Sequence, residues 1–200
     1  GDARPYANVT LFDKVSGYLK AVNVARSDPE KAGQILAEID SAETDAQYQA
    51  ALADLENRKK LAQRDADLLK RGNVSVQQAQ TSDTAMRMGE QIVRNLATLR
   101  SYESIRAPFD GTITARFADP GALLQQATTS QSAALPVLTI SDNSKLRIGV
   151  YVEQRDVPYV RIGDGADVSD ASDPTRRLTA KISRSAGALD PRTRTLYVEI

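Results

Sequence analysis

The feature that most constrains the fold is a long segment without proline. Residues 41 to 103 contain no proline and only two glycines, Gly72 and Gly89, whereas all eight prolines of the chain lie outside this segment. Proline breaks the interior of a helix and glycine disfavours it, so the segment predicts helix over most of its length. Gly72 lies near the middle and suits the position after a helix C-terminus, where φ is positive. The segment therefore predicts two helices joined by a short turn.

The apolar residues of both predicted helices follow the spacing of a coiled-coil seam. In the first helix the predicted seam is Tyr48, Leu52, Leu55, Lys59, Ala62, Ala66 and Leu69. In the second helix it is less regular and consists of Ala79, Met86, Ile92, Val93, Leu96 and Leu99. Ion pairs four residues apart support the outer face of the first helix: Asp54–Arg58, Glu56–Lys60 and Asp67–Arg71. With about 28 residues each, the helices would extend about 40 Å.

Both helices begin with residues that are typical of helix caps. Asp40 or Ser41 can cap the first helix, and Glu43 would complete a capping box with Asp40. Ser75 and Gln78 have the spacing of a second capping box, at the start of the second helix. These caps predict that the first helix starts at residue 40 or 41 and the second at residue 75.

The segments on both sides of the hairpin are predicted to be β-structure. Residues 8 to 40 and 104 to 140 contain short apolar stretches separated by turn signals. The two segments share an outline that indicates an internal repeat. The matching positions are Gly17-x-Leu19 with Gly111-x-Ile113, Asp28-Pro29 with Asp119-Pro120, and Ile39 with Ile140. Asp110-Gly111 predicts a two-residue hairpin turn.

The last part of the chain returns to β-structure. The predicted strands are residues 145–152, 177–182 and 195–200, and residues 153–160 are predicted to form a short helix. Gly163-Asp164-Gly165 predicts a turn. Several short strands at this spacing are typical of a small barrel.

Composition excludes several classes of function. The 26 basic residues balance the 26 acidic ones, and only 5% of residues are aromatic, so nothing favours binding of nucleic acid. The chain has no Cys and no His. This removes thiolate and imidazole metal sites, cysteine nucleophiles and the usual general base near neutral pH. We expect no enzymatic activity and no cofactor.

No segment of about 18 apolar residues is present that could span a membrane, and no signal peptide is visible. The chain opens abruptly and closes on an alternating pattern, residues 195–200, that looks like an unfinished strand. We expect it to be a piece of a longer protein whose targeting signal or anchor lies elsewhere.

The order of a β half, a long hairpin, a second β half and a small barrel resembles the periplasmic adaptor subunits, or membrane fusion proteins, of tripartite efflux pumps. The segments that carry the resemblance are VSGYL (15–19), KAGQILAEID (31–40), IRAPFDGTI (105–113) and AGALDPRTRT (186–195). The last of these resembles the resistance-nodulation-division (RND) branch. The resemblance covers nearly the whole chain.

The resemblance implies an α+β fold, elongated and modular. A lipoyl-like β-sandwich, residues 8–40 plus 104–140, would be split by a coiled-coil α-helical hairpin, residues 41–103. A β-barrel domain would follow at residues 141–200, joined by residues 1–7 and incomplete at its C-terminus. True lipoyl or biotinyl carriers present a Lys where the hairpin is inserted here, so no carrier Lys is expected.

The resemblance also implies a docking tip. Adaptor hairpins of this family carry an Arg, a Leu four residues on and a Ser seven residues further, and Arg64, Leu68 and Ser75 match that spacing beside Gly72. In the family these residues contact a TolC-like outer-membrane channel. Three structural readings remain open beside this one: Arg64 as a solvated helix residue, Leu68 as a packing residue and Ser75 as a helix cap only.

The chain departs from the family pattern in its first β half. A Gly usually precedes the Asp of the turn there, and this chain has Ser27 before Asp28. The conformation of that turn is therefore an open question for the structure.

The predicted function is that of an adaptor between an inner-membrane transporter of the RND type and a TolC-like outer-membrane channel. The family implies a periplasmic location, an N-terminal lipid or helix as membrane anchor, and self-association into a ring of six subunits. The alternatives are an adaptor of an ABC exporter or type I secretion system, a lipoyl or biotinyl carrier domain, and a coiled-coil scaffold without a transport role.

Overall fold

The computed structural model describes residues 1–125, 135–169, 173, 175 and 177–200. These residues form two compact units. One unit is Val9–Ile140, and the other combines Gly1–Asn8 with Ser141–Ile200. Strands β1 (Asp2–Leu11) and β8 (Leu138–Glu153) contribute residues to both units.

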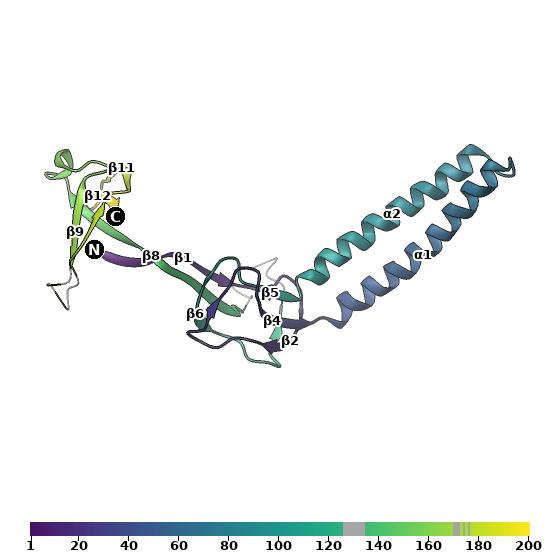
Figure 1. The fold of residues 1–200 in the computed structure, drawn as a ribbon, viewed down its shortest axis with the longest axis horizontal. Helices are drawn as coiled ribbons and strands as arrows, with labels where there is room; N and C mark the ends of the chain where they lie inside the picture. The colour runs from purple at the N-terminus through teal and green to yellow at the C-terminus, as the bar shows by residue number, and fades with distance from the viewer. Residues whose placement is uncertain (126–134, 170–172, 174, 176) are drawn as a thin grey trace. The chain divides into compact units, whose positions relative to one another are not determined.

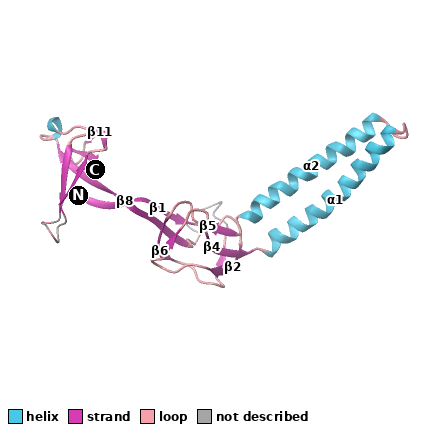
Figure 2. Cartoon of the chain, in the orientation of Figure 1, coloured by secondary structure: helices cyan, strands magenta, loops and turns pink. Residues whose placement is uncertain are grey.

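The predicted helical hairpin is confirmed. Helix α1 (Ala42–Lys70) and helix α2 (Val76–Ser101) lie side by side with opposite directions, as Figure 1 shows. Their 29 and 26 residues correspond to lengths of about 43 and 39 Å. Figure 2 separates them by colour from the strands that precede and follow them along the chain.

The strands of the Val9–Ile140 unit form a β-sandwich around one core. One sheet has the order β5 (Ser104–Arg106), β4 (Ile35–Asp40), β2 (Gly17–Val22) and β7 (Leu123–Leu124). The other side consists of β3 (Pro29–Glu30), β6 (Gly111–Arg116) and the start of β8. The largest fully buried apolar side chains of this unit are Leu19, Leu36, Ile113, Leu124, Val137, Leu138 and Ile140. Burying each such side chain stabilises the fold by about 1.5–3 kcal/mol.

The two β halves exchange strands. Strand β2 of the first half pairs antiparallel with β7 of the second, and β3 of the first half pairs antiparallel with β6 of the second. Gly17 lies opposite Leu124, and Pro29 lies opposite Thr112. This reciprocal pairing agrees with the internal repeat in the sequence, and it means that neither half completes its sheet without the other.

The predicted hairpin turn at Asp110-Gly111 is wrong. Strand β6 begins at Gly111, but it pairs with β3, whereas β5 belongs to the other sheet. Asp110 instead ties the halves together: its Oδ1 accepts a hydrogen bond from Ala32 N at 2.8 Å, and its Oδ2 lies 3.2 Å from Lys31 Nζ. The Ala32 N–H and then the Lys31 ammonium hold the pKa of Asp110 below its ordinary value. Tertiary pairing thus overrides the local turn signal.

The turn that departs from the family pattern keeps a left-handed residue. Ser27 has a φ of 77°, a conformation that glycine adopts more readily. Its N–H donates to Ile113 O at 2.8 Å, and Asp28 Oδ2 accepts from Ala25 N at 2.7 Å. These hydrogen bonds hold Ser27 in the left-handed conformation that the glycine of the family pattern would adopt.

The second unit is built from strands around a small apolar cluster. Strands β11 (Arg184–Asp190), β12 (Thr195–Glu199) and β8 are adjacent, and β9 (Gly165–Ser169) pairs with β10 (Arg177–Lys181). Ile182, Leu196 and Val198 are its buried apolar residues.

Several predictions for this part of the chain need correction. The helix predicted at residues 153–160 is only a short 3-10 turn, Val157–Tyr159, because Pro158 suits the start of such a turn but not a helix interior. The strand predicted at 145–152 is longer: it begins at Leu138, in the second β half, and forms one continuous strand, β8. Strands β9 and β11 were not predicted: the alternation in β9 extends over only five residues, and β11 does not alternate between apolar and polar residues. The strand at 195–200 and the turn at Gly163 are confirmed.

Candidate functional site: the helical hairpin, its tip and its base

The seam of α1 differs from the predicted seam in its second half. Leu55 and Ala62 are buried as predicted, but Lys59 and Ala66 are exposed. Arg58 and the buried Asp65 face α2 in their place. The seam advances by three residues twice in succession, from Leu52 to Leu55 and from Leu55 to Arg58. This shifts the phase of the heptad repeat, and coiled coils accommodate such a shift by local overwinding. Lys59 lies beside the seam and pairs with Glu90 across the hairpin at 3.2 Å.

The seam of α2 contains small residues that the apolar pattern did not reveal. Ser82 and Gly89 are buried, whereas the predicted members Ile92 and Leu99 are 47% and 39% exposed. A Cβ added to Gly89 would lie 3.1 Å from Arg58 Cδ and 3.2 Å from Leu55 Cδ1. The absence of a side chain at Gly89 therefore permits the close approach of the two helices.

Arg58 was predicted to lie on the outer face, and it lies at the seam instead. Its Nε bonds to Asp54 Oδ2 at 2.7 Å, which confirms the predicted ion pair. Its Nη1 also donates to the backbone oxygen of Ala85, on α2, at 3.2 Å. The Arg58 side chain thus pairs with Asp54 on its own helix and also contacts the other helix. The predicted Glu56–Lys60 pair forms at 2.7 Å, whereas Asp67 pairs with Lys70.

Helix α1 ends in a motif that requires a left-handed residue. Gly72 has a φ of 74°, as its position predicted. Its N–H donates to Leu69 O at 2.9 Å, and Asn73 N donates to Leu68 O at 2.9 Å. This is the hydrogen-bond pattern of a Schellman motif, which satisfies the last carbonyl groups of the helix. The motif fixes where α1 stops and the turn begins.

Ser75 is the N-cap of α2, and the predicted capping box forms only in part. Ser75 Oγ accepts a hydrogen bond from Gln78 N at 3.1 Å. The Gln78 side chain does not return to Ser75; its Nε2 donates to Asp65 Oδ2 at 3.3 Å, across the hairpin. A tertiary partner therefore replaces the local one.

The capping box predicted for α1 does not form. Asp40 is the last residue of β4, and Ser41 is the N-cap. The Ser41 hydroxyl makes no cap hydrogen bond and lies 2.8 Å from Thr44 Oγ1. Glu43 accepts a hydrogen bond from Gln47 at 3.2 Å. Because Asp40 belongs to β4, it does not occupy the N-cap position of α1.

The hairpin tip consists of residues 71–75 and the helix ends beside them. Two of the three predicted docking residues share one face of this tip. Arg64 and Leu68 line a shallow groove on the outer face of α1. The other lining residues are Lys60, Gln63, Asp67 and Arg71. Arg64 is exposed and Leu68 half-buried. Ser75 is exposed but does not line this groove, and its hydroxyl is engaged in the cap.

The charge of this groove is positive. Lys60 pairs with Glu56 at 2.7 Å, and Asp67 pairs with Lys70 at 2.9 Å. The excess positive charge therefore comes from Arg64 and Arg71. Sequence analysis missed Lys60, Asp67 and Arg71 as neighbours of the docking residues. Their positions follow from helical periodicity, since residues three, four and seven apart share one face. An arginine in this setting presents a planar fork of donors to carbonyl or carboxylate groups.

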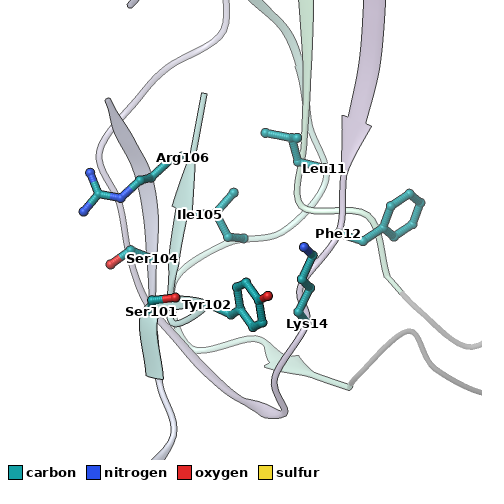
Figure 3. Close-up of a pocket in the computed structure, with 8 residues that line it drawn as sticks. All are labelled: Leu11, Phe12, Lys14, Ser101, Tyr102, Ser104, Ile105 and Arg106. Atoms are coloured by element: carbon teal, nitrogen blue, oxygen red, sulfur yellow. The ribbon is translucent and has the colours of Figure 1, made fainter. Parts of the chain in front are cut away.

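A second concave region lies where α2 meets β5, at the base of the hairpin (Figure 3). It is lined by Leu11, Phe12, Lys14, Ser101, Tyr102, Ser104, Ile105 and Arg106. Lys14 Nζ lies 4.5 Å from the centre of the Tyr102 ring, and Arg106 Nη1 donates to Gly33 O at 2.9 Å. The Lys14 ammonium thus packs on the Tyr102 ring.

Charged residues at the base link the two helices. Arg100 Nε lies 2.6 Å from Asp45 Oδ1, and the Arg100 guanidinium lies 5.3 Å from the Tyr48 ring. Burial raises the pKa of Glu103, and the nearby Asp45 raises it further while Arg100 lowers it. Glu103 Oε1 is buried without a hydrogen-bond partner among the described residues. The single guanidinium of Arg100 therefore acts on two carboxylates, those of Asp45 and Glu103.

Within the described residues, no group of three or more acidic side chains could hold a metal ion. In the same residues no helix is both long enough and apolar enough to cross a membrane.

A β-sandwich made of two interleaved halves with a long helical hairpin between them defines the barrel-sandwich hybrid class of protein. The family model described as "RND MFP, barrel-sandwich hybrid domain" matches residues 7–137. The chain therefore belongs to this family of membrane fusion proteins, which confirms the resemblance found in the sequence and agrees with the prediction that it is not an enzyme.

Curated relatives support the assignment over part of their length. The chain is 28% identical to the multidrug resistance protein MdtA of Yersinia pestis over 166 residues, which cover 76% of this chain and 36% of MdtA. It is 28% identical to the macrolide export protein MacA of Escherichia coli O157:H7 over 202 residues, covering 87% of this chain and 53% of MacA. The chain thus spans about half or less of these relatives.

Solved structures share the fold. A MacA-MexA chimera that contains the Pseudomonas aeruginosa MexA α-hairpin domain has a TM-score of 0.88 and 26% identity, covering 99% of this chain and 69% of the chimera. The membrane fusion protein Spr0693 of Streptococcus pneumoniae has a TM-score of 0.80 at 15% identity, covering 99% of this chain and 89% of its own, and this likeness concerns the fold alone. The predicted α+β fold with a helical hairpin inserted into a β-sandwich is confirmed.

Proposed function

We propose that this chain is part of a periplasmic adaptor that links an inner-membrane transporter to an outer-membrane channel and helps to form a closed export conduit. The observation that carries the proposal is the family match over residues 7–137, which includes the whole hairpin and both halves of the sandwich. A rigid β-sandwich supports a hairpin whose tip bears exposed polar residues, a suitable form for a bridging protein. In this proposal the chain contributes no catalytic group to the transporter or to the channel.

The proposed contact with the channel is made by Arg64, Leu68 and Ser75. Arg64 is exposed in a groove of positive charge, and Leu68 offers an apolar surface four residues along the same face. Ser75 Oγ accepts from Gln78 N, but a hydroxyl keeps its own proton to donate to a partner. Capping and docking are therefore compatible roles for Ser75. The complementary surface on the channel would consist of carbonyl or carboxylate groups around an apolar contact.

The test is capture of a TolC-like channel by the purified full-length adaptor. Arg64→Asp reverses the charge of the groove, and Leu68→Ala removes the apolar contact. We expect each to reduce capture at least about tenfold, which corresponds to a loss of about 1.4 kcal/mol of binding energy. Channel capture at wild-type levels by both variants would contradict the tip assignment.

Matched control substitutions lie on the same hairpin away from the tip. Arg94→Asp makes the same change at an exposed position of α2 that is 18 residues past its start at Val76, about 27 Å along the helix. Leu99→Ala makes the same truncation near the base of the hairpin, at a residue that is 39% exposed. Both controls should leave channel capture unchanged. A loss as large as that of the tip variants would indicate general weakening of the hairpin.

The proposed inner-membrane partner is an RND transporter, because the matching family model is that of the RND membrane fusion proteins. Cross-linking of the full-length adaptor in membranes, followed by mass spectrometry, should recover an RND transporter. Recovery of an ABC exporter or a type I secretion component in its place would assign the adaptor to the alternative partner.

The proposal includes the division of the chain and its assembly. The lipoyl-like domain would comprise residues 8–40 and 104–140, the hairpin residues 41–103, and the barrel domain residues 141–200 with 1–7. Copies would associate side by side into a ring of about six around the conduit, held at the membrane by an anchor at the N-terminus. Native mass spectrometry of the assembled pump measures the copy number, and fractionation of cells locates the full-length protein.

A further inference from the structure

The seam between α1 and α2 contains one buried carboxylate, and its partner lies on the other helix. Asp65 is only 5% exposed, and Gln78 Nε2 donates a hydrogen bond to Asp65 Oδ2 at 3.3 Å. Removing the donor from a carboxylate this buried costs stability, because few water contacts remain to replace the lost hydrogen bond. The pair therefore favours the one alignment of the helices in which these two side chains meet.

The contacts across the seam share one centre. Asp65 lies seven residues before Gly72, and Gln78 lies six residues after it. Leu55 and Gly89, which approach each other closely, are both 17 residues away from Gly72. Every one of these contacts is consistent with a single register of the two antiparallel helices, centred on the turn.

Apolar packing near the tip does little to define that register. Between Leu55 and Leu69, the residues of α1 that face α2 are Arg58, Ala62 and Asp65. The facing residues of α2 in this region include Ala79 and the buried Ser82. Ala62, Ala79 and Ser82 are small and similar in size, so they pack almost equally well after a shift along the seam. Directional polar contacts have to distinguish one register from the next, as a single buried polar residue does in coiled coils.

We propose that the hydrogen bond between Asp65 and Gln78 fixes the register of the hairpin and thereby decides which residues form its tip. A shift of one heptad moves the helices about 10 Å past each other and separates the two side chains. Because the helices are connected, the same shift moves the turn three or four residues along the chain, toward Leu68 or Ser75. Asp65 and Gln78 are thus positioning residues for the tip.

The inference about docking rests on the proposed function, whereas the inference about register concerns this chain alone. In the observed register Arg64 and Leu68 lie on the face of α1 just before the turn, and Ser75 caps α2. In a shifted register Leu68 or Ser75 would lie within the turn. The spacing that docking requires would then be lost while the helices persist.

The register can be read from cysteine cross-links, because the chain has no native cysteine. Lys59 and Met86 lie 13 and 14 residues from Gly72 and are therefore nearly opposite in the observed register, so Lys59→Cys with Met86→Cys reports it. Lys59→Cys with Ala79→Cys, or with Val93→Cys, reports a shift of one heptad in either direction. The probe is a bifunctional maleimide that spans less than one heptad of helix, about 10 Å.

The key comparison is between one disruptive substitution and its compensating partner. Gln78→Glu places two carboxylates against each other and removes the donor. Adding Asp65→Asn restores a hydrogen bond of the same length in the opposite direction. We expect Gln78→Glu at pH 7 to raise cross-linking of a shifted pair at least about fivefold, the effect of about 1 kcal/mol. We expect the double variant to return to the native pattern.

A second double variant separates the polar contact from folding. Asp65→Leu with Gln78→Leu keeps an apolar seam, so helical content measured by circular dichroism should equal or exceed that of the unsubstituted chain. Both native and shifted pairs should then cross-link. A purely native pattern in this variant overturns the proposal, because the Gly72 turn and the contacts at the hairpin base would then set the register without the polar pair. Failure of Asp65→Asn to rescue Gln78→Glu overturns it as well.

Channel capture distinguishes this proposal from the proposed function. If the unsubstituted full-length adaptor captures the channel, Gln78→Glu should reduce capture and Asp65→Asn should restore it. If it captures no channel, the proposed function fails, and the cross-linking pattern still tests the register independently.

Discussion

The β-sandwich and the hairpin of the same unit are held together in different ways. In the sandwich Leu19, Leu36 and Ile113 are at most 1% exposed, within a continuous apolar core. In the hairpin the buried residues are Leu55, Ala62, Asp65, Ser82 and Gly89. Of these only Leu55 is a large apolar residue. The difference shows that the sandwich provides stability and that the hairpin seam provides close approach and alignment.

The difference has a geometric cause. Two helices in contact share only one seam, and most of each helix faces water, so little apolar area can be buried. The interleaved halves of the sandwich enclose residues from both sheets. The hairpin therefore depends on its attachment to the sandwich and on specific contacts such as Arg58 to Ala85 O. Four substitutions test this contrast, from the largest expected effect to the smallest.

The largest effect is expected in the sandwich core. Leu36 is fully buried, and Leu36→Ala removes its contacts and leaves a cavity, at a cost of about 2–5 kcal/mol in the free energy of unfolding. Leu61→Ala on the hairpin, where the side chain is 38% exposed, should cost much less. Urea denaturation followed by circular dichroism measures both. Equal losses would break the contrast between the two regions.

A smaller effect is expected at the point of closest helix approach. Gly89→Leu places a side chain where even a Cβ would lie 3.1 Å from Arg58 Cδ. Overpacking of this kind costs about 1–3 kcal/mol and should displace Arg58 from Ala85 O. Hydrogen exchange should show faster exchange in α1 and α2 and unchanged protection in β4. Ala66→Leu, at an exposed position of α1, is the matched control and should have little effect.

A stabilising substitution is expected in the first β half. Ser27 has a φ of 77°, where an L-residue is strained, so Ser27→Gly should stabilise the sandwich by about 1 kcal/mol or less after the entropy of glycine is counted. Gly121, in the turn of the second half, is a native glycine that also has a positive φ, 93°. Gly121→Ser should destabilise by a similar amount. Thermal unfolding midpoints of both variants decide this, and a lower midpoint for Ser27→Gly contradicts the reading.

The smallest effect depends on pH and lies at the hairpin base. Burial, and then Asp45, raises the pKa of Glu103, so the folded state binds its proton more tightly than the unfolded state. The stabilising contribution of Glu103 is therefore present at low pH and lost as pH rises through the raised pKa. Glu103→Gln should stabilise the unit at pH 7, with a gain that shrinks toward pH 4.

An exposed glutamate provides the opposite sign as a control. A hydrogen bond from Lys60 lowers the pKa of Glu56, so its contribution is present at neutral pH and lost as pH falls. Glu56→Gln should therefore give no stabilisation at pH 7. Unfolding midpoints of both glutamine variants between pH 4 and 8 provide the measurement. A gain for Glu103→Gln that is independent of pH would contradict the assigned cause.

The sequence alone determined the hairpin, its turn and the two β halves. Glycine and proline carry strong local preferences, so Gly72 and the proline-free segment predict the helices and their junction without knowledge of the fold. The spacing of Arg64, Leu68 and Ser75 likewise placed them beside the turn. Their docking role is a proposal that the channel-capture experiment tests.

Only the tertiary structure decided which residues face one another. The seam passes through Arg58 and Asp65, not Lys59 and Ala66, because contacts with α2 shift its phase. Asp110 is a link between halves and not a hairpin turn, because β6 pairs with β3. A side chain's local sequence fixes its preferred conformation, but its partner depends on segments far away along the chain. That dependence is why Gln78 bonds to Asp65 and not to the cap that its own sequence predicts.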